Sequence, residues 1–274
     1  MQQPPPPYGG QPSSPYTSPA QMQGPGMATE QQMPPEVYQL AGTYQLGTLN
    51  VLYKPTFTNP LAIIGITIGV IILDIILAAV IYNVGFIVYI LFLLPIFMIV
   101  FAINRIANCN LRVYAFTNGL VRAKGSQNDV IRWDQVQAVL QNITRGTYSG
   151  TTHNYTVRRG DGATFKFGSV LRNVANLGQT LQQEVARALL PRAIAAYNAG
   201  SALPFGSLSI SVQGINNGSE TVPWNQVQNV EVKQGFVLVK KMGKSLNWAR
   251  VKVSTIPNFP VFMGMVSYAR GGQR

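Results

Sequence analysis

The chain has 274 residues, of which 47% are hydrophobic, and its 21 basic and nine acidic side chains give a formal net charge of +12. A single cysteine and a single histidine exclude an internal disulfide and argue against a nucleophilic triad or a metal centre. We therefore expect no catalytic residue, metal ligand or cofactor, and predict a protein that is not an enzyme. The first 104 residues hold one base and three acids, whereas the remainder holds 20 bases and six acids.

The first 36 residues are rich in Pro, Gln, Gly and Ser and almost free of aliphatic side chains. Such a segment buries too little apolar surface to offset the entropy of ordering it, so we predict a disordered tail over residues 1–36. Residues 37–60 have a different character. Val37–Leu40 and Leu49–Tyr53 show the short alternation of strands, which predicts a strand-like segment beside the membrane.

A hydrophobic run extends from Leu61 to Ile103, interrupted by Asp74 and by the tetrad 82–85. As a single helix it would be about 64 Å long at ~1.5 Å per residue, whereas the hydrocarbon core of a bilayer is about 30 Å thick. We therefore predict a transmembrane helical hairpin over residues 61–103, with helices at 61–81 and 86–103. The alternative is a buried hairpin inside a soluble core.

Basic residues flank this hairpin and are absent from its turn. Lys54 precedes the first span, and Arg105 and Arg112 follow the second. By the positive-inside rule, we predict a multi-pass protein of the cell membrane with both termini in the cytoplasm and the turn at 82–85 outside.

Asp74 lies near the middle of the first predicted span, where a carboxylate costs roughly 2.5–3.5 kcal/mol to insert. Gly65 and Gly69 form a Gly-x-x-x-Gly spacing in the same helix, which permits the close approach of another helix. We expect these three residues to make intramembrane helix contacts, in a homo-oligomer or with a protein partner. The alternative is a transport or channel-like subunit organised around Asp74.

After the hairpin, one pattern occurs twice: a strand, a glycine turn, a second strand, and then Trp-(Asp/Asn)-Gln-Val-Gln-x-Val. The two copies contain the segments Leu111–Val121 with Val130–Val139, and Leu208–Ile215 with Thr221–Val230. A helix closes each copy. We predict the first helix over Val174–Asn198 and the second from an N-cap at Asn258 to about Tyr268.

This order of strands, glycine turn, Trp-Asp-Gln-Val and terminal helix resembles a bacterial pleckstrin-homology-like (PH-like) domain. Over residues 46–270 the chain is similar to a family of uncharacterised bacterial membrane proteins that join a two-helix hairpin to such domains. The resemblance implies an α+β membrane protein, in which the transmembrane hairpin accompanies two tandem small β-barrels with C-terminal helices. We assign PH-like repeat 1 to residues 111–200 and PH-like repeat 2 to 204–270. The second is short for a barrel, and we expect it to borrow a strand from residues 46–53.

Bases stand at matching turns of the two copies, and we predict that they bind lipid or a partner: Arg158, Arg159, Lys240, Lys241 and Lys244. Each base near an anionic leaflet contributes ~1 kcal/mol of attraction. The alternative is that the positive charge serves only solubility and topology. Trp133 and Trp224 hold equivalent positions, and we expect both in the barrel cores rather than as stacking platforms for a ligand.

These features predict a membrane-anchored, non-catalytic binding or scaffolding protein whose cytoplasmic domains contact anionic lipid headgroups or partner proteins. Nucleic-acid binding by the basic half is a further alternative, which we favour less. It would require the strand aromatics to stack on bases, namely Tyr155, Phe165, Phe167 and Trp248.

Overall fold

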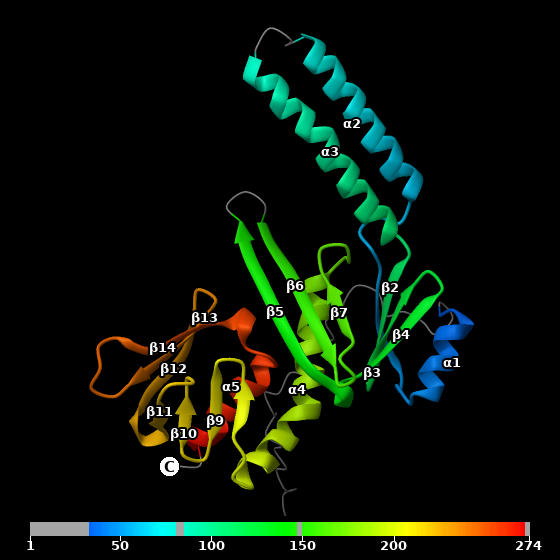
Figure 1. Ribbon diagram of the computed structural model, residues 1–274. Coiled ribbons are helices and arrows are strands. Elements are labelled where there is room, and N and C mark those ends of the chain that lie inside the picture. The colour runs from blue at the N-terminus through cyan, green and yellow to red at the C-terminus, as the bar shows by residue number, and fades with distance from the viewer. Residues whose placement is uncertain (1–32, 81–84, 147–149, 272–274) are drawn as a thin grey trace, which may run out of the picture.

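The computed structural model describes residues 33–80, 85–146 and 150–271. In these ranges the chain forms five α-helices and four small antiparallel sheets, so the predicted α+β class is confirmed. Figure 1 shows a helical hairpin that projects from one of two β units. All but the last four positions of the predicted disordered tail lie outside the described residues.

The first β unit, here called unit one, contains seven strands and the helix that follows them. Four strands pair in chain order as one sheet: β1 (Leu49–Tyr53), β2 (Leu111–Phe116), β3 (Gly119–Lys124) and β4 (Gln127–Arg132). A single-turn helix, η2 (Trp133–Gln135), leads into the second sheet. That sheet consists of β5 (Val136–Gly146), β6 (Gly150–Arg159) and β7 (Thr164–Phe167). Inward-facing side chains of both sheets share one core.

The helical hairpin is inserted between β1 and β2. Helix α2 (Pro60–Val80) follows β1, and helix α3 (Gly85–Ala107) leads back to β2. These helices lie close to the predicted limits of 61–81 and 86–103, and the turn residues Tyr82–Val84 lie outside the described part of the chain.

The strand before the hairpin belongs to unit one. β1 pairs with β2, and Tyr53 lies opposite Val113. Tyr53 and Val51 pack into the unit one core. The expectation that residues 46–53 lend a strand to the second repeat is therefore wrong, because the apolar side chains of this strand complete the first sheet instead.

The segment Val37–Leu40 is helical, and the prediction of a strand there is wrong. It forms part of α1 (Pro35–Thr43), which has proline in its first turn. Val37 and Ala41 are one helical turn apart, and both are buried against the face of the first sheet that carries Phe116. The segment therefore follows the i to i+4 spacing of apolar side chains that is typical of a helix, and not the alternation that is typical of a strand.

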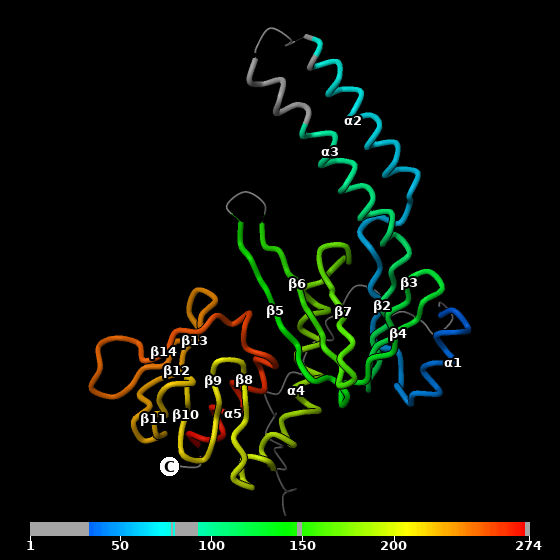
Figure 2. The backbone as a smooth tube through the Cα atoms, in the orientation of Figure 1, coloured from blue at the N-terminus to red at the C-terminus, as the bar shows by residue number. Residues whose placement is uncertain are grey.

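Helix α4 (Val174–Asn198) has the predicted limits and is shared by both units. Its first half supplies Leu177, Leu181 and Val185 to the core of unit one. Its second half places Leu190, Ile194 and Tyr197 against unit two. Figure 2 traces this helix from one unit to the other. One continuous helix therefore joins the two cores.

The second β unit, unit two, has seven strands of its own. One sheet contains β8 (Leu203–Phe205), β9 (Leu208–Ser211), β10 (Gly214–Asn216) and β11 (Thr221–Pro223). After η3 (Trp224–Gln226), the other sheet contains β12 (Val227–Lys233), β13 (Phe236–Lys241) and β14 (Asn247–Lys252). The β8–β9 connection is only Gly206-Ser207, whereas the corresponding connection of unit one contains the whole hairpin.

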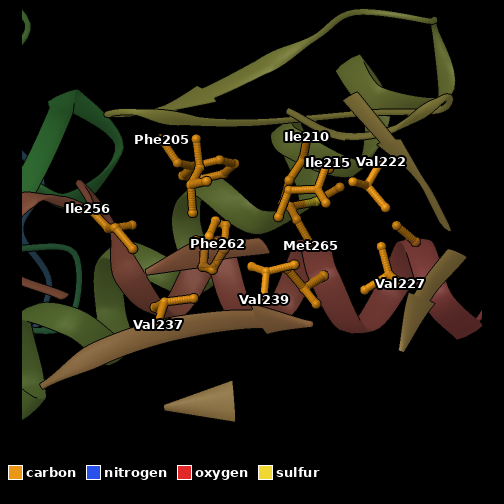
Figure 3. Packing of buried hydrophobic residues seen from close by; sticks show 14 of the residues in the cluster. Phe205, Ile210, Ile215, Val222, Val227, Val237, Val239, Ile256, Phe262 and Met265 are labelled. Carbon is orange, nitrogen blue, oxygen red and sulfur yellow. The ribbon is translucent and has the colours of Figure 1, made fainter. Parts of the chain in front are cut away.

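A single-turn helix, η4 (Val253–Thr255), and then α5 (Phe259–Gly271) complete unit two. Figure 3 shows Phe262 and Met265 of α5 among the strand residues of this core, including Phe205 and Val239. Asn258 directly precedes α5, but its side chain does not cap the helix as predicted. Its carboxamide bonds to the backbone of β5 in unit one, because the chain passes along that strand before α5 begins.

Candidate functional site

The hairpin is joined to unit one by backbone pairing on both sides of Pro55. The amide of Thr56 donates to the carbonyl of Val170 at 2.7 Å, and the amide of Arg172 donates to the carbonyl of Lys54 at 2.9 Å. Asn59 then caps α2, since its Oδ1 accepts from the amide of Leu61 at 3.0 Å. These bonds fix where α2 leaves the unit. We call the end of unit one that carries the hairpin its hairpin face.

Arg105, in the last turn of α3, ties the other helix to the same loop. Its Nη1 donates to the carbonyl of Ser169 at 3.1 Å. The guanidinium also lies 4.9 Å from the ring centroid of Phe101 and 5.5 Å from that of Phe57. These distances permit cation–π attraction to both rings.

Five bases surround the base of the hairpin, and we call them the basic collar: Lys54, Arg105, Arg112, Lys124 and Arg172. Lys54 follows β1, and Lys124 ends β3 opposite the first residue of β2. Lys54 and Arg172 are exposed, and the other three are partly exposed. No collar base forms an ion pair with any residue that the structure describes. The collar is therefore a concentration of uncompensated positive charge.

All six acids of residues 105–274 form ion pairs with bases outside the collar. Each of the six lies within ion-pair distance of a base: Asp129–Arg122, Asp134–Arg132, Asp161–Arg159, Glu184–Arg187, Glu220–Lys241 and Glu231–Lys240. The Arg159 guanidinium lowers the pKa of Asp161 to about 2, and hydrogen bonds from Lys241 and Trp248 lower the pKa of Glu220. All six carboxylates are thus paired with bases outside the collar.

Among the described residues, three of the five bases predicted to bind lipid are already paired with an acid, and two are not. Arg159 is bound to Asp161 at 2.6 Å, and its Nη1 also donates to the carbonyl of Val130. Lys241 is bound to Glu220 at 2.8 Å, and Lys240 lies 3.9 Å from Glu231. Arg158 and Lys244 are exposed.

The structure also separates these predicted bases from the hairpin and from each other. Arg158 and Arg159 end β6, and the β6–β7 turn that follows them lies at the end of unit one opposite the hairpin (Figure 1). The lysines belong to unit two. The five residues therefore form no common surface. Sequence reasoning used Lys54, Arg105 and Arg112 only to orient the hairpin, and it did not predict that they stand with Lys124 and Arg172 at its base.

A cavity of about 590 Å³ opens between the two sheets of unit one, beside the end of α3. Its polar lining includes Asn108, Arg122, Asn142, Asn154 and Lys166, and none of its described lining residues is acidic. The sequence gives one signal for this opening: the distal halves of β5 and β6, residues 141–146 and 150–154, contain a single aliphatic side chain. Strands without inward apolar side chains cannot close a core.

The donors in this cavity suit an anion. Arg122 holds Asp129 at 2.8 Å through Nη1, whereas its Nε is buried and has no hydrogen-bond partner among the described residues. Burial raises the pKa of Tyr155, so its hydroxyl remains protonated at neutral pH. Guanidinium, ammonium, amide and phenol groups together can donate to the oxygens of a phosphate.

The two predicted core tryptophans are buried at equivalent positions. Trp133 is 3% exposed and Trp224 is 4% exposed. Each begins a single-turn helix and donates its indole N–H to a backbone carbonyl, that of Thr117 at 3.1 Å and that of Ser211 at 2.9 Å. Neither ring offers a face to a ligand.

The aromatic side chains considered for base stacking have structural roles. Tyr155, Phe165 and Phe167 are buried in unit one. The indole of Trp248 donates to Glu220 at 2.8 Å. No observation favours the stacking of nucleic-acid bases on these rings.

Asp74 and the glycine pair lie on different faces of α2. Asp74 is buried, as are Ile63 and Thr67, and its Oδ1 has no hydrogen-bond partner among the described residues. Gly65 and Gly69 are exposed, with open space where a Cβ would stand. At about 100° per residue, the glycines lie opposite the buried stripe. The three predicted contact residues therefore cannot serve one interface.

The other reactive side chains do not cluster. Cys109 is a buried thiol, and His153 stacks on Tyr155 with centroids 6.4 Å apart. Within the described ranges, no three residues among His, Cys, Asp and Glu are grouped so that they could hold a metal ion.

A protein-family model, that of a family of unknown function, matches residues 27–274. No curated protein matches the chain.

Proposed function

The chain belongs to this family of unknown function (DUF6585), and we propose that it is a membrane-anchored, non-catalytic binding or scaffolding protein. In this proposal the helical hairpin crosses the cell membrane twice, both termini are cytoplasmic, and the two β units are PH-like domains. Unit one rests its hairpin face on the anionic headgroups of the inner leaflet.

Exposed apolar surface supports the membrane part of the proposal. Among the described residues, one helix stretch, Pro60–Leu77, is long and apolar enough to span a bilayer, and most of its side chains are exposed. In α3, the stretch whose side chains are described, Leu93–Ala107, is apolar but shorter. Isoleucine, leucine, valine and phenylalanine side chains cover the outer surface of α2 and of residues 93–107 in α3, a surface that water would disfavour.

The order of elements supports the assignment of PH-like units. Both units have a four-stranded sheet, a single-turn helix that begins with a buried tryptophan, a three-stranded sheet and a long helix. The amide of Gly160 donates to the carbonyl of Gln135, and that of Met242 donates to the equivalent Gln226. This detail favours two copies of one unit, with the hairpin inserted into the first connection of one copy.

One observation carries the lipid proposal: five bases of unit one that form no ion pair with a described residue lie at the base of the hairpin, whereas the acids of the C-terminal half are paired elsewhere. If the hairpin spans the membrane, the collar stands within a Debye length of the inner leaflet, where each base contributes ~1 kcal/mol. The anion-compatible cavity lies beside the same helix end.

The experiment is lipid competition with the full-length protein in nanodiscs. A collar variant replaces Lys54, Arg112, Lys124 and Arg172 with Gln, and a control variant replaces Arg158, Lys233, Lys244 and Lys252. Native mass spectrometry then counts the phosphatidylglycerol and phosphatidylcholine molecules that remain bound. We expect the collar variant alone to lose its preference for the anionic lipid. Equal preference in both variants would contradict the proposal.

Transport remains the second candidate because of one observation, the buried and unpartnered Oδ1 of Asp74. An intramembrane carboxylate commonly marks an ion path or a helix contact. The stripe that Asp74 shares with Ile63 and Thr67 favours helix contact, since it lies along one side of α2. Flux of protons or monovalent cations into liposomes that contain the protein would establish transport.

A further inference from the structure

The edge of β5 in unit one is occupied by a segment from unit two. The amide of Asn258 donates to the carbonyl of Val139 at 2.9 Å, and the amide of Val139 donates to Oδ1 of Asn258 at 2.8 Å. Nδ2 of Asn258 donates to the carbonyl of Gln137 at 2.8 Å. The short stretch around Asn258 therefore binds β5 as an added peptide would.

Among the residues that the structure describes, no such segment lies on the corresponding edge of unit two. Gln228 and Val230 of β12 follow Trp224 by four and six residues, as Gln137 and Val139 follow Trp133. Val230 pairs with Val239 across the sheet, and no described residue outside that sheet bonds to its backbone. A cavity of about 450 Å³ lies here between β12 and α5, lined by Val230, Met263, Val266, Ser267, Arg270 and Gly271.

One difference between the two edges indicates what the open one would bind. Arg270 donates through Nη2 to the carbonyl of Gln228 at 3.1 Å, at the position where Asn258 donates in unit one. The open edge therefore has a guanidinium at Gln228, two residues before Val230, whose amide bonds to no described residue outside the sheet. A carboxylate can accept from both groups and also forms an ion pair with the guanidinium, whereas a carboxamide would gain a hydrogen bond without the second charge.

We propose that the groove between β12 and α5, the β12 groove, binds an extended acidic peptide segment of a partner protein. The segment adds to the edge of β12 as a strand, and an Asp or Glu carboxylate accepts from the amide of Val230 and the guanidinium of Arg270. The exposed Val232 and Lys233 continue the edge with an apolar and a basic side chain. A second copy of this chain is disfavoured as the occupant, because its own Asn258 segment is already held by its own β5.

The groove can be tested separately from lipid contact. Full-length protein in nanodiscs of neutral lipid is titrated with a fluorescein-labelled peptide of eight alternating Val and Asp residues, and with the matched Val and Asn peptide. We expect the Asp peptide to bind more tightly, and Arg270→Gln to weaken it about tenfold, the loss of one charge-assisted hydrogen bond. Lys252→Gln is the charge-matched control and should leave binding unchanged.

Hydrogen exchange locates the binding site in the same samples. We expect the Asp peptide to protect the amides of 227–233 while leaving 136–146 unchanged. Equal binding by the Arg270→Gln variant, or no protection at 227–233, would overturn the proposal. Tighter binding after deletion of residues 272–274 would assign the groove to the chain's own terminus, and self-association lost in Arg270→Gln would assign it to a second copy. Either result would also overturn the proposal that a partner peptide occupies the groove.

Discussion

The guanidinium of Arg105 in α3 donates to the carbonyl oxygen of Ser169 in the loop after β7, 3.1 Å away. The same loop pairs with residues 54–56, immediately before α2. Both helices of the hairpin are therefore attached to one loop of unit one, and these contacts position the hairpin on the unit.

Replacing Arg105 with Ala should loosen that attachment. The variant loses a hydrogen bond to a charged donor and the cation–π contact with Phe101, which together amount to about 2 kcal/mol. Thermal unfolding of the detergent-solubilised protein should show a lower Tm. Arg158→Ala is the control, since Arg158 is exposed and belongs to no ion pair in the described structure. An equal Tm for the two variants would show that the contact does not hold the hairpin.

The buried tryptophans should be essential to their own units. Trp133→Ala or Trp224→Ala should lower the free energy of unfolding by about 3–5 kcal/mol, because each removes a large ring from a closed core. Trp→Phe should cost less, since it chiefly removes the hydrogen bond to a carbonyl. Urea unfolding followed by circular dichroism measures both. Loss of less than about 1 kcal/mol from the Ala variants would contradict the packing described here.

Stability should fall at acid pH partly through Asp161. Its folded pKa is about 2, below the ordinary value of 3.8, so the pair with Arg159 stabilises the fold above pH ~4. That contribution is lost as the pH falls from ~4 through 2. In Asp161→Asn, the urea midpoint should depend less on pH within this window. Arg159→Gln should produce the same flattening, and an unchanged pH dependence in both variants would show that the pair is not formed.

Substitutions of Asp74 should distinguish a role in helix contact from a role in transport. If it serves contact within the hairpin, Asp74→Asn should keep the stability of the protein in detergent, because an amide still forms hydrogen bonds. Asp74→Leu removes the polar group and, by values from model peptides, should cost ~1–2 kcal/mol. Transport predicts instead that both variants abolish liposome flux while the protein stays folded, so flux and thermal unfolding are measured on the same preparations.

Local sequence patterns identified most elements but not all of their partners. The limits of α4 and the burial of Trp133 and Trp224 follow from periodicity and from the repeated Trp-x-Gln-Val pattern. The partner of residues 49–53 did not follow, because the strand that pairs with them is separated by the whole hairpin. Strand pairing over such a distance leaves no local signal.

The candidate site was the hardest part to anticipate. Adjacent bases in the sequence, such as Arg158 and Arg159, were predicted to bind lipid. In the structure Arg159 instead forms an ion pair with Asp161, two residues away. Lys54, Arg105 and Arg112 were recognised as bases that flank the hairpin, but the fold adds Lys124 and Arg172 to them through strand pairing and through the loop after β7. The role of Asn258 was also missed. A cap residue before a helix can be recognised from the local sequence, whereas the bonds from Asn258 to the distant strand β5 cannot.

In the proposed arrangement unit one, and not unit two, rests its hairpin face on anionic headgroups. The most direct measurement is hydrogen exchange of the full-length protein in nanodiscs of phosphatidylglycerol and in nanodiscs of phosphatidylcholine. The account predicts added protection in the anionic nanodiscs at 54–57, 111–124 and 166–172, with no change at 236–244. Equal exchange in both lipids, or protection at 236–244 alone, would contradict it.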